Sequence, residues 1–161
     1  MGSSIMKWSD ILEDVRQIGV DTSLFIYLIE RHPVYLSVVL PLFERISNGH
    51  LRIVTSVVSL IEILTLPLAQ QQAVYVSEYR EMLLNTDGVV TLPISIPIAE
   101  RAAQLRARFR LRTPDAIQIA AALDVNCSIW VTNDRQLKRV TDLRVIALDE
   151  IEPVTVDSDN L

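Results

Sequence analysis

The sequence predicts an α/β fold, in which helices cover a central parallel sheet. Half of the 161 residues are hydrophobic but only 6% are aromatic, so the core should consist mainly of Val, Ile, Leu and Ala. Strand-like and helical patterns alternate along the chain, which implies parallel strands joined by right-handed connections. A chain of this length is expected to form one domain with a single core.

Five short segments have the composition of buried strands. They are residues 18–20, 51–55, 89–92, 128–132 and 144–148. The second of these is short and rich in β-branched residues, which favours a strand over a helix. Asp87-Gly88 forms a turn before the third segment, and Pro93 closes it.

Helices are predicted where apolar residues recur at helical spacing between chain breakers. They are expected over residues 24–30, 34–47, 56–66, 69–84, 98–110 and 113–123, with a short helical segment that ends near residue 139. Asn48-Gly49 is a stop signal for the second helix. Pro67 is expected to end the third.

The predicted domain spans residues 17–148, with a segment outside it at each end. Trp8, Ile11, Leu12 and Val15 have helical spacing, so residues 1–16 are expected to form an arm that contains a short amphipathic helix. The first four residues are typical of a cloning remnant. The acidic residues 149–161 show no core pattern and are predicted to form a frayed, flexible tail.

Composition excludes several classes of protein. Cys127 is the only cysteine, which rules out an intrachain disulfide and favours the reducing cytoplasm. No apolar run approaches the roughly 18 residues of a membrane span, so no membrane association is expected. His32 and His50 are the only histidines and lie in turn contexts, which gives no support to a zinc site. Ser23 has no histidine partner in the pattern, so a hydrolase triad is unsupported.

Four acidic residues stand out by their positions, although each has an ordinary structural explanation. Asp21 occupies a helix N-cap position, and Asp134 fits turn chemistry after a strand. Glu62 has the spacing of a capping box, but Ser56 makes a better helix start, so Glu62 falls inside the helix. Asp115 lies in a first helical turn, where an acid favours the helix dipole.

The four acids also share one edge of the predicted sheet, where ligands bind in open α/β folds. Two carboxylates about 6 Å apart repel by roughly 3 kcal/mol at an effective dielectric near 20. A helix cap contributes only about 1 kcal/mol, so capping alone does not explain such a cluster. Mg²⁺ takes hard oxygen ligands and removes the repulsion. The sequence therefore predicts that Asp21, Glu62, Asp115 and Asp134 form a metal site.

Four segments in order and spacing resemble the motifs of PIN-domain ribonucleases, and within them the VapC-type toxins of bacterial toxin–antitoxin pairs. They are residues 20–23, 59–62, 113–122 and 131–135. The similarity covers about residues 17–148. It implies a PIN-like three-layer fold, with a mostly five-stranded parallel sheet flanked by helices.

The resemblance also implies a function. It implies a Mg²⁺-dependent or Mn²⁺-dependent endoribonuclease that forms a homodimer and is blocked by an antitoxin protein. Asp21, Glu62 and Asp115 match the family's main metal-binding acids, and Asp134 matches the fourth, more variable one. The small polar residues that match the supporting positions are Thr22, Ser23, Thr132 and Asn133.

Arginines follow one another closely just ahead of Asp115. Five of them fall within twelve positions, although the net charge of the chain is −5. Guanidinium groups suit phosphate contacts, so Arg108, Arg110 and Arg112 are candidates for holding RNA phosphates. A solvated helix face is the alternative interpretation.

Three other functions compete with the toxin. One is a PIN nuclease of RNA processing outside toxin–antitoxin systems, and another is a catalytically silent PIN binding module. A response-regulator receiver domain also clusters acids at a strand edge, but it needs a lysine after a late strand. The only lysines are Lys7 and Lys138, and Lys138 lies a turn too far beyond Thr132.

Overall fold

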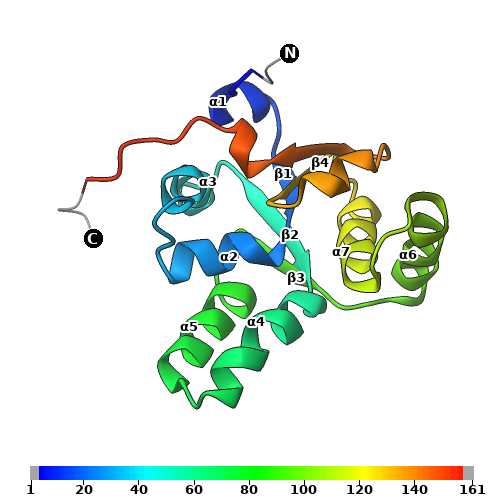
Figure 1. The fold of residues 1–161 in the computed structure, drawn as a ribbon, viewed down its shortest axis with the longest axis horizontal. Helices are drawn as coiled ribbons and strands as arrows, with labels where there is room; N and C mark the ends of the chain where they lie inside the picture. Colours follow the sequence, from blue (N-terminus) through cyan, green and yellow to red (C-terminus); the bar gives the residue numbers. More distant parts are fainter. Residues whose placement is uncertain (1–3, 158–161) are drawn as a thin grey trace.

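The structure is a computed structural model that describes residues 4–157, in which one sheet lies between two layers of helices (Figure 1). All five strands are parallel, in the order β3-β2-β1-β4-β5. This confirms the predicted α/β class. The strands are β1 (Gln17–Val20), β2 (Arg52–Ser56), β3 (Val89–Leu92), β4 (Ile129–Thr132) and β5 (Arg144–Ala147).

Four of the strands are largely buried, as parallel strands usually are, whereas the edge strand β3 is half-buried. In β4, Ile129 and Val131 belong to the core on one face, while Trp130 belongs to the core on the other. Residue Gly19 of β1 pairs with Trp130 in register and brings the backbone close to that indole ring. Strand β4 therefore carries side chains into both cores, whereas the buried apolar side chains of β1, Ile18 and Val20, belong to one.

One face is covered by α2, α3, α4 and α5, of which α4 packs against β2 and α5 against β3 (Figure 1). The other is covered by α6 and α7, and the alanines of α7 allow it to pack closely on β1 and β2. None of the described helices is long and apolar enough to cross a membrane. The bounds are α2 (Thr22–Ile29), α3 (Leu36–Ser47), α4 (Val57–Ala69), α5 (Ala73–Leu84), α6 (Ile96–Phe109) and α7 (Thr113–Asp124).

The expectation that Pro67 ends the third predicted helix is wrong, because α4 continues to Ala69 and buries Pro67. Proline removes one backbone donor, which is tolerable close to a helix end. The chain turns at Gln71, whose φ is 55°, and the N–H of Gln72 then donates to the carbonyl of Pro67 at 2.9 Å. Because α4 extends to Ala69 and the turn at Gln71 follows it, α5 begins at Ala73, later than expected.

The N-terminal arm packs into the domain. Its helix α1 (Trp8–Ile11) is shorter than the pattern suggests, and Asp14 has a φ of 60° that stops any continuation. Trp8, Ile11 and Leu12 are buried, and the indole Nε1 of Trp8 donates to the carbonyl of Val38 in α3 at 2.7 Å. Most of the expected cloning remnant lies outside the described residues.

The prediction of a frayed tail from Asp149 onward is wrong for its first residues. Leu148–Glu150 forms a 3-10 turn, η2, and both Glu150 and Ile151 are buried. Ile151 pairs with Met6 in a parallel bridge, so the two ends of the domain lie together. The side chain of Ile151 is buried where the tail pairs with the arm, which explains why these first tail residues have a defined structure. Residues 158–161 lie outside the described part.

Glu150 forms an ion pair that holds η2 onto the short 3-10 helix η1 (Arg135–Arg139). The ammonium of Lys138 donates to both carboxylate oxygens of Glu150, at 2.7 and 2.6 Å. Burial works to raise the pKa of Glu150, but the bonds from Lys138 and from the N–H of Ala147 outweigh it and lower the pKa below its usual 4.5. The ionised form is therefore favoured by folding.

Replacing Glu150 by Gln is expected to lower the free energy of unfolding by about 1–3 kcal/mol at pH 7, because a charged hydrogen-bond partner is lost. A lowered folded-state pKa stabilises the protein above pH 4.5, and this contribution disappears as the pH falls below that value. The free energies of unfolding of wild type and Glu150→Gln, measured by urea denaturation, should thus converge as the pH is lowered toward about 3. Asp149→Asn, which breaks an exposed pair with Arg135, should change little at any pH.

Candidate active site

Asp21 lies where β1 ends and α2 begins. As the N-cap of α2, it accepts a hydrogen bond from the N–H of Ser23 at 3.4 Å, so the predicted cap is present. Its other oxygen accepts from the hydroxyl of Thr132 in β4 at 2.8 Å. Burial raises the pKa of Asp21, against the lowering effect of these bonds, and the charge of Asp115 raises it further.

Glu62 lies on α4, inside the helix that Ser56 caps, as expected. The hydroxyl of Thr22 donates to its Oε1 at 3.1 Å, which joins α4 to the start of α2. Partial burial raises the pKa of Glu62, and the carboxylates of Asp21 and Asp115 add to this effect. The Glu62 side chain is thus within electrostatic reach of both aspartates.

Asp115 lies in the first turn of α7, on the opposite face of the sheet from α2. Its Oδ2 accepts a hydrogen bond from Nε of Arg112 at 3.1 Å. The Asp115 side chain is 18% exposed and that of Arg112 is 77% exposed. Arg112 therefore places a solvated positive charge beside a carboxylate that is much less accessible.

Asp134 lies just beyond β4 and caps η1, because its Oδ1 accepts from the N–H of Gln136 at 2.9 Å. Its own N–H donates to the hydroxyl of Thr132 at 3.0 Å. Since the same hydroxyl donates to Asp21, Thr132 connects the loop after β4 to the end of β1. Asp134 therefore caps a turn, as its sequence context predicts, and it also lies at the carboxyl end of β4 beside Asp21.

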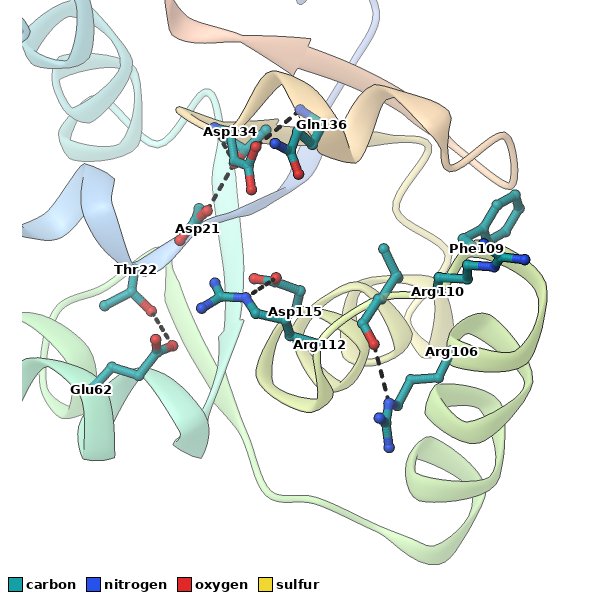
Figure 2. Close-up of polar contacts among 12 residues, drawn as sticks. Asp21, Thr22, Glu62, Arg106, Phe109, Arg110, Arg112, Asp115, Asp134 and Gln136 are labelled. Atoms are coloured by element: carbon teal, nitrogen blue, oxygen red, sulfur yellow. Dashed lines mark hydrogen bonds and ion pairs between the residues drawn. The ribbon is translucent and has the colours of Figure 1, made fainter.

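The four acids gather at the carboxyl ends of the strands, as Figure 2 shows, with Arg112 reaching toward Glu62 and Asp21 from the N-cap position of α7. Glu62, Asp115 and Asp134 each retain one carboxylate oxygen that accepts no hydrogen bond from residues 4–157. As the side chains are placed, no three His, Cys, Asp or Glu residues among those described form a group compact enough for one ion. Holding an ion through three of them requires side-chain rotation.

This set of donors fits a hard divalent cation. All the donors are carboxylate or hydroxyl oxygens, which Mg²⁺ prefers. Burial and the proximity of Asp115 disfavour the charged forms of Asp21 and Glu62, so a cation would relieve an existing electrostatic cost. Arg112 already offsets part of this cost.

The predicted supporting residues differ in their contacts. The hydroxyls of Thr22 and Thr132 each donate to an acid, while the backbone N–H of Ser23 donates to Asp21, which caps α2. The hydroxyl of Ser23 is buried and has no partner within the described residues. The side-chain amide of Asn133 donates to the hydroxyl of Tyr27 at 2.7 Å and not to one of the four acids.

Of the three candidate arginines, only Arg112 is placed at the acids. Arg108 forms an ion pair with Asp142 at 2.8 Å and stacks on the Phe109 ring, 4.7 Å from its centroid. Arg110 is the C-cap of α6, with a φ of 53°, and its carbonyl accepts from Arg139 at 3.2 Å. The helix end therefore directs these side chains to different places.

Gln118 is a residue whose importance the sequence pattern did not reveal. It is buried in α7, one turn after Asp115, and bonds to hydroxyl groups of α2 and α4. In the sequence it is a single polar residue between the apolar Ile117 and Ile119. A polar residue within a buried helix face is the only local signal of such a contact.

The family model of the PIN domain matches residues 18–143, which is most of the chain and includes all four acids. The chain belongs to the PIN domain family. PIN domains are generally nucleases, and they generally use divalent metal ions. The match therefore supports nuclease activity for this PIN domain.

Solved structures of toxin–antitoxin complexes contain chains with a similar fold. VapBC2 from Rickettsia felis, bound to a DNA fragment from its promoter, matches with a TM-score of 0.65 and 17% identity, over 81% of this PIN domain's chain and 98% of the other. A toxin–antitoxin complex from Klebsiella pneumoniae has a TM-score of 0.60 and 21% identity, over 81% and 97%. VapBC-5 from Mycobacterium tuberculosis has a TM-score of 0.53 and 20% identity, over 81% of this PIN domain's chain and 98% of the other. At these identities the likeness shows the fold.

A search of curated protein sequences finds no match to this PIN domain.

Proposed function

We propose that this PIN domain is a metal-dependent endoribonuclease and the toxin of a VapBC-type toxin–antitoxin pair. The observation that carries the proposal is the meeting of Asp21, Glu62 and Asp115 at one edge of a PIN fold, close enough to affect one another's ionisation. These acids come from three separate elements on both faces of the sheet. An ordinary cap or surface charge needs no such convergence.

In this proposal Asp21, Glu62 and Asp115 hold one ion directly or through water, and Asp134 helps to fix a second ion or the attacking water. A bound Mg²⁺ or Mn²⁺ ion supplies polarisation of the scissile phosphate, a more acidic water and charge stabilisation at the leaving 3′ oxygen. Thr22 and Thr132 orient two of the carboxylates through their hydroxyl groups. No protein nucleophile is required.

Arg112 is proposed to hold an RNA phosphate next to the scissile one. Its exposed guanidinium lies beside Asp115 and can turn to a phosphate without breaking a buried contact. Arg112→Ala is expected to weaken RNA binding across sequences and to reduce the dependence of log K on log salt by about one phosphate contact. Fluorescence anisotropy at several salt concentrations measures both quantities.

Arg108→Ala is the matched control, because Arg108 also lies near the end of α6 but pairs with Asp142 away from the acids. It is expected to leave the salt dependence unchanged. Equal losses in the two variants would mean that the arginines act through general charge and that Arg112 has no specific role.

Metal titration tests the proposal. Mn²⁺ or Mg²⁺ at about 100 times its dissociation constant should stabilise the protein by about 2.7 kcal/mol, which raises the melting temperature by roughly 5–10 °C for a domain of this size. Single-stranded RNA should be cleaved in the presence of the ion and protected by EDTA, whereas DNA of the same sequence should persist. A protein that neither gains stability nor cleaves RNA would be a PIN binding module.

The proposed partners are a second copy of the chain and an antitoxin protein. Their support is that similar folds occur in toxin–antitoxin complexes and that α4 and α5 expose large apolar side chains. These include Ile61, Leu66, Leu68 and Val74. Such surfaces usually mark protein interfaces. Light scattering should show a dimer. Expression in bacteria should arrest growth unless the antitoxin is co-expressed. An RNA-processing nuclease would not need an antitoxin, so this result distinguishes it from a toxin.

A further inference from the structure

A layer of buried hydroxyl and amide groups lies beneath the acids, with Gln118 at its centre. The side chain of Gln118 is 3% exposed. Its Nε2 donates to the hydroxyls of Thr22 at 3.1 Å and Ser59 at 2.8 Å. Its Oε1 accepts from the backbone N–H of Ser56 at 3.1 Å and from the Ser56 hydroxyl at 2.7 Å. One amide therefore joins α7 to β2, α4 and α2.

The orientation of this amide is determined by the backbone. The N–H of Ser56 can only donate, so it requires the oxygen of Gln118 and turns the amide nitrogen toward the two other hydroxyls. Thr22 then receives a hydrogen bond from the amide and keeps its own proton to donate. This hydroxyl lies 3.1 Å from Oε1 of Glu62, which can only accept, and 2.8 Å from the hydroxyl of Ser59, where either oxygen can donate. With Ser59 donating to Thr22, the hydrogen bonds run from Gln118 through Thr22 to Glu62.

The same contacts link the elements that carry the acids. Thr22 follows Asp21 directly, Ser59 lies one turn before Glu62, and Gln118 lies one turn after Asp115. Hydrogen bonds in a buried network are strong and leave few alternative arrangements. A displacement of Gln118 would therefore alter the spacing of the three acidic residues together.

We propose that Gln118 is a positioning residue of the metal site, which sets the spacing of the acid-bearing elements and directs the Thr22 hydroxyl to Glu62. The inference rests on the proposed function, because it concerns how the same acids bind an ion. Residues that orient metal ligands without touching the ion typically change metal affinity by 10–100-fold. A network that served folding alone would change stability and leave affinity unaltered.

Gln118→Met tests this role, since methionine has a similar length but no hydrogen-bonding amide. The dissociation constant for Mn²⁺, measured by calorimetry on the full chain, is expected to rise by at least about tenfold. The control is Gln17→Met. Gln17 is a partly buried glutamine of β1 that donates to the carbonyl of Val125 at 2.7 Å, at the opposite edge of the sheet. Its replacement should leave the Mn²⁺ affinity unchanged.

Two variants of Thr22 keep the test decisive if Gln118→Met fails to fold. Thr22→Val removes the hydroxyl and should weaken Mn²⁺ binding to the same degree as Gln118→Met, whereas Thr22→Ser keeps the hydroxyl and should bind nearly as wild type does. The double variant Thr22→Val/Gln118→Met should bind Mn²⁺ no more weakly than Thr22→Val alone. Both substitutions break the same chain of hydrogen bonds to Glu62, so their effects should not add.

Two results would overturn the inference. Affinity within about twofold of wild type in Gln118→Met or in Thr22→Val would show that the network does not position the ligands, because changes to such residues cost at least about tenfold. Absence of Mn²⁺ binding by the wild-type chain would instead refute the proposed function, and the positioning role with it.

Discussion

Asp115→Asn is expected to abolish RNA cleavage, with a loss well beyond the 10–100-fold that residues behind metal ligands contribute. Asparagine keeps the shape of the side chain but cannot supply the negative charge that attracts a cation. Asp115 affects the ionisation of both Asp21 and Glu62, which places its charge within electrostatic reach of each. Cleavage of labelled RNA by equal concentrations of wild type and variant measures the loss.

The same substitution should leave the metal-free fold intact or make it more stable. It removes one of three mutually repelling charges, and it sacrifices only an ion pair with the exposed Arg112, worth at most about 1 kcal/mol. The melting temperature without metal should therefore be equal to or above that of wild type. The gain in melting temperature on adding Mn²⁺ should disappear.

Asp142→Asn provides the control for Asp115→Asn, because it also removes an aspartate paired with an arginine, here Arg108. It should retain full cleavage and the full response to Mn²⁺. Undiminished cleavage by Asp115→Asn would refute the proposed mechanism. A collapse of its metal-free stability would mean that Asp115 serves the fold.

Gly19→Ala is expected to destabilise the domain by about 2–3 kcal/mol, which lowers the melting temperature by roughly 5–10 °C. A Cβ atom at this position would lie 2.6 Å from Cε3 of Trp130 and 2.7 Å from Cβ of Ala122. Both neighbours are buried, and neither an indole ring in a packed core nor a helix alanine can move away cheaply. Thermal unfolding followed by circular dichroism measures the effect.

Gly49→Ala is the comparison for Gly19→Ala, because Gly49 has a φ of 74° but nothing within 4 Å of an added Cβ. Its cost should be only the backbone strain, about 1 kcal/mol. A stability of Gly19→Ala equal to that of Gly49→Ala would show that α7 and β4 can separate from β1 without loss.

The strands and the place of the acids could be predicted from local sequence. β3 has the predicted bounds, and each other strand differs by one residue at one or both ends, because β-branched composition and turn residues act over a few positions. Asp21 directly follows β1 and Asp134 lies two residues after the end of β4, and parallel strands bring their carboxyl ends to one edge. The location of a candidate site thus followed from the order of elements alone.

Side-chain directions and segment ends depended on distant contacts. Ile151 is ordered by Met6, and Arg108 is turned away from the acids by Asp142. Gln118 bonds to Ser59 and Thr22, which lie 59 and 96 residues away, so no local pattern could identify its partners. Local sequence determined which segments form strands and where the acids lie, because those choices rest on short-range sterics and on polypeptide connectivity. Only the tertiary structure decided which arginine faces the acids and which amide lies beneath them, because those contacts form between elements far apart in the chain.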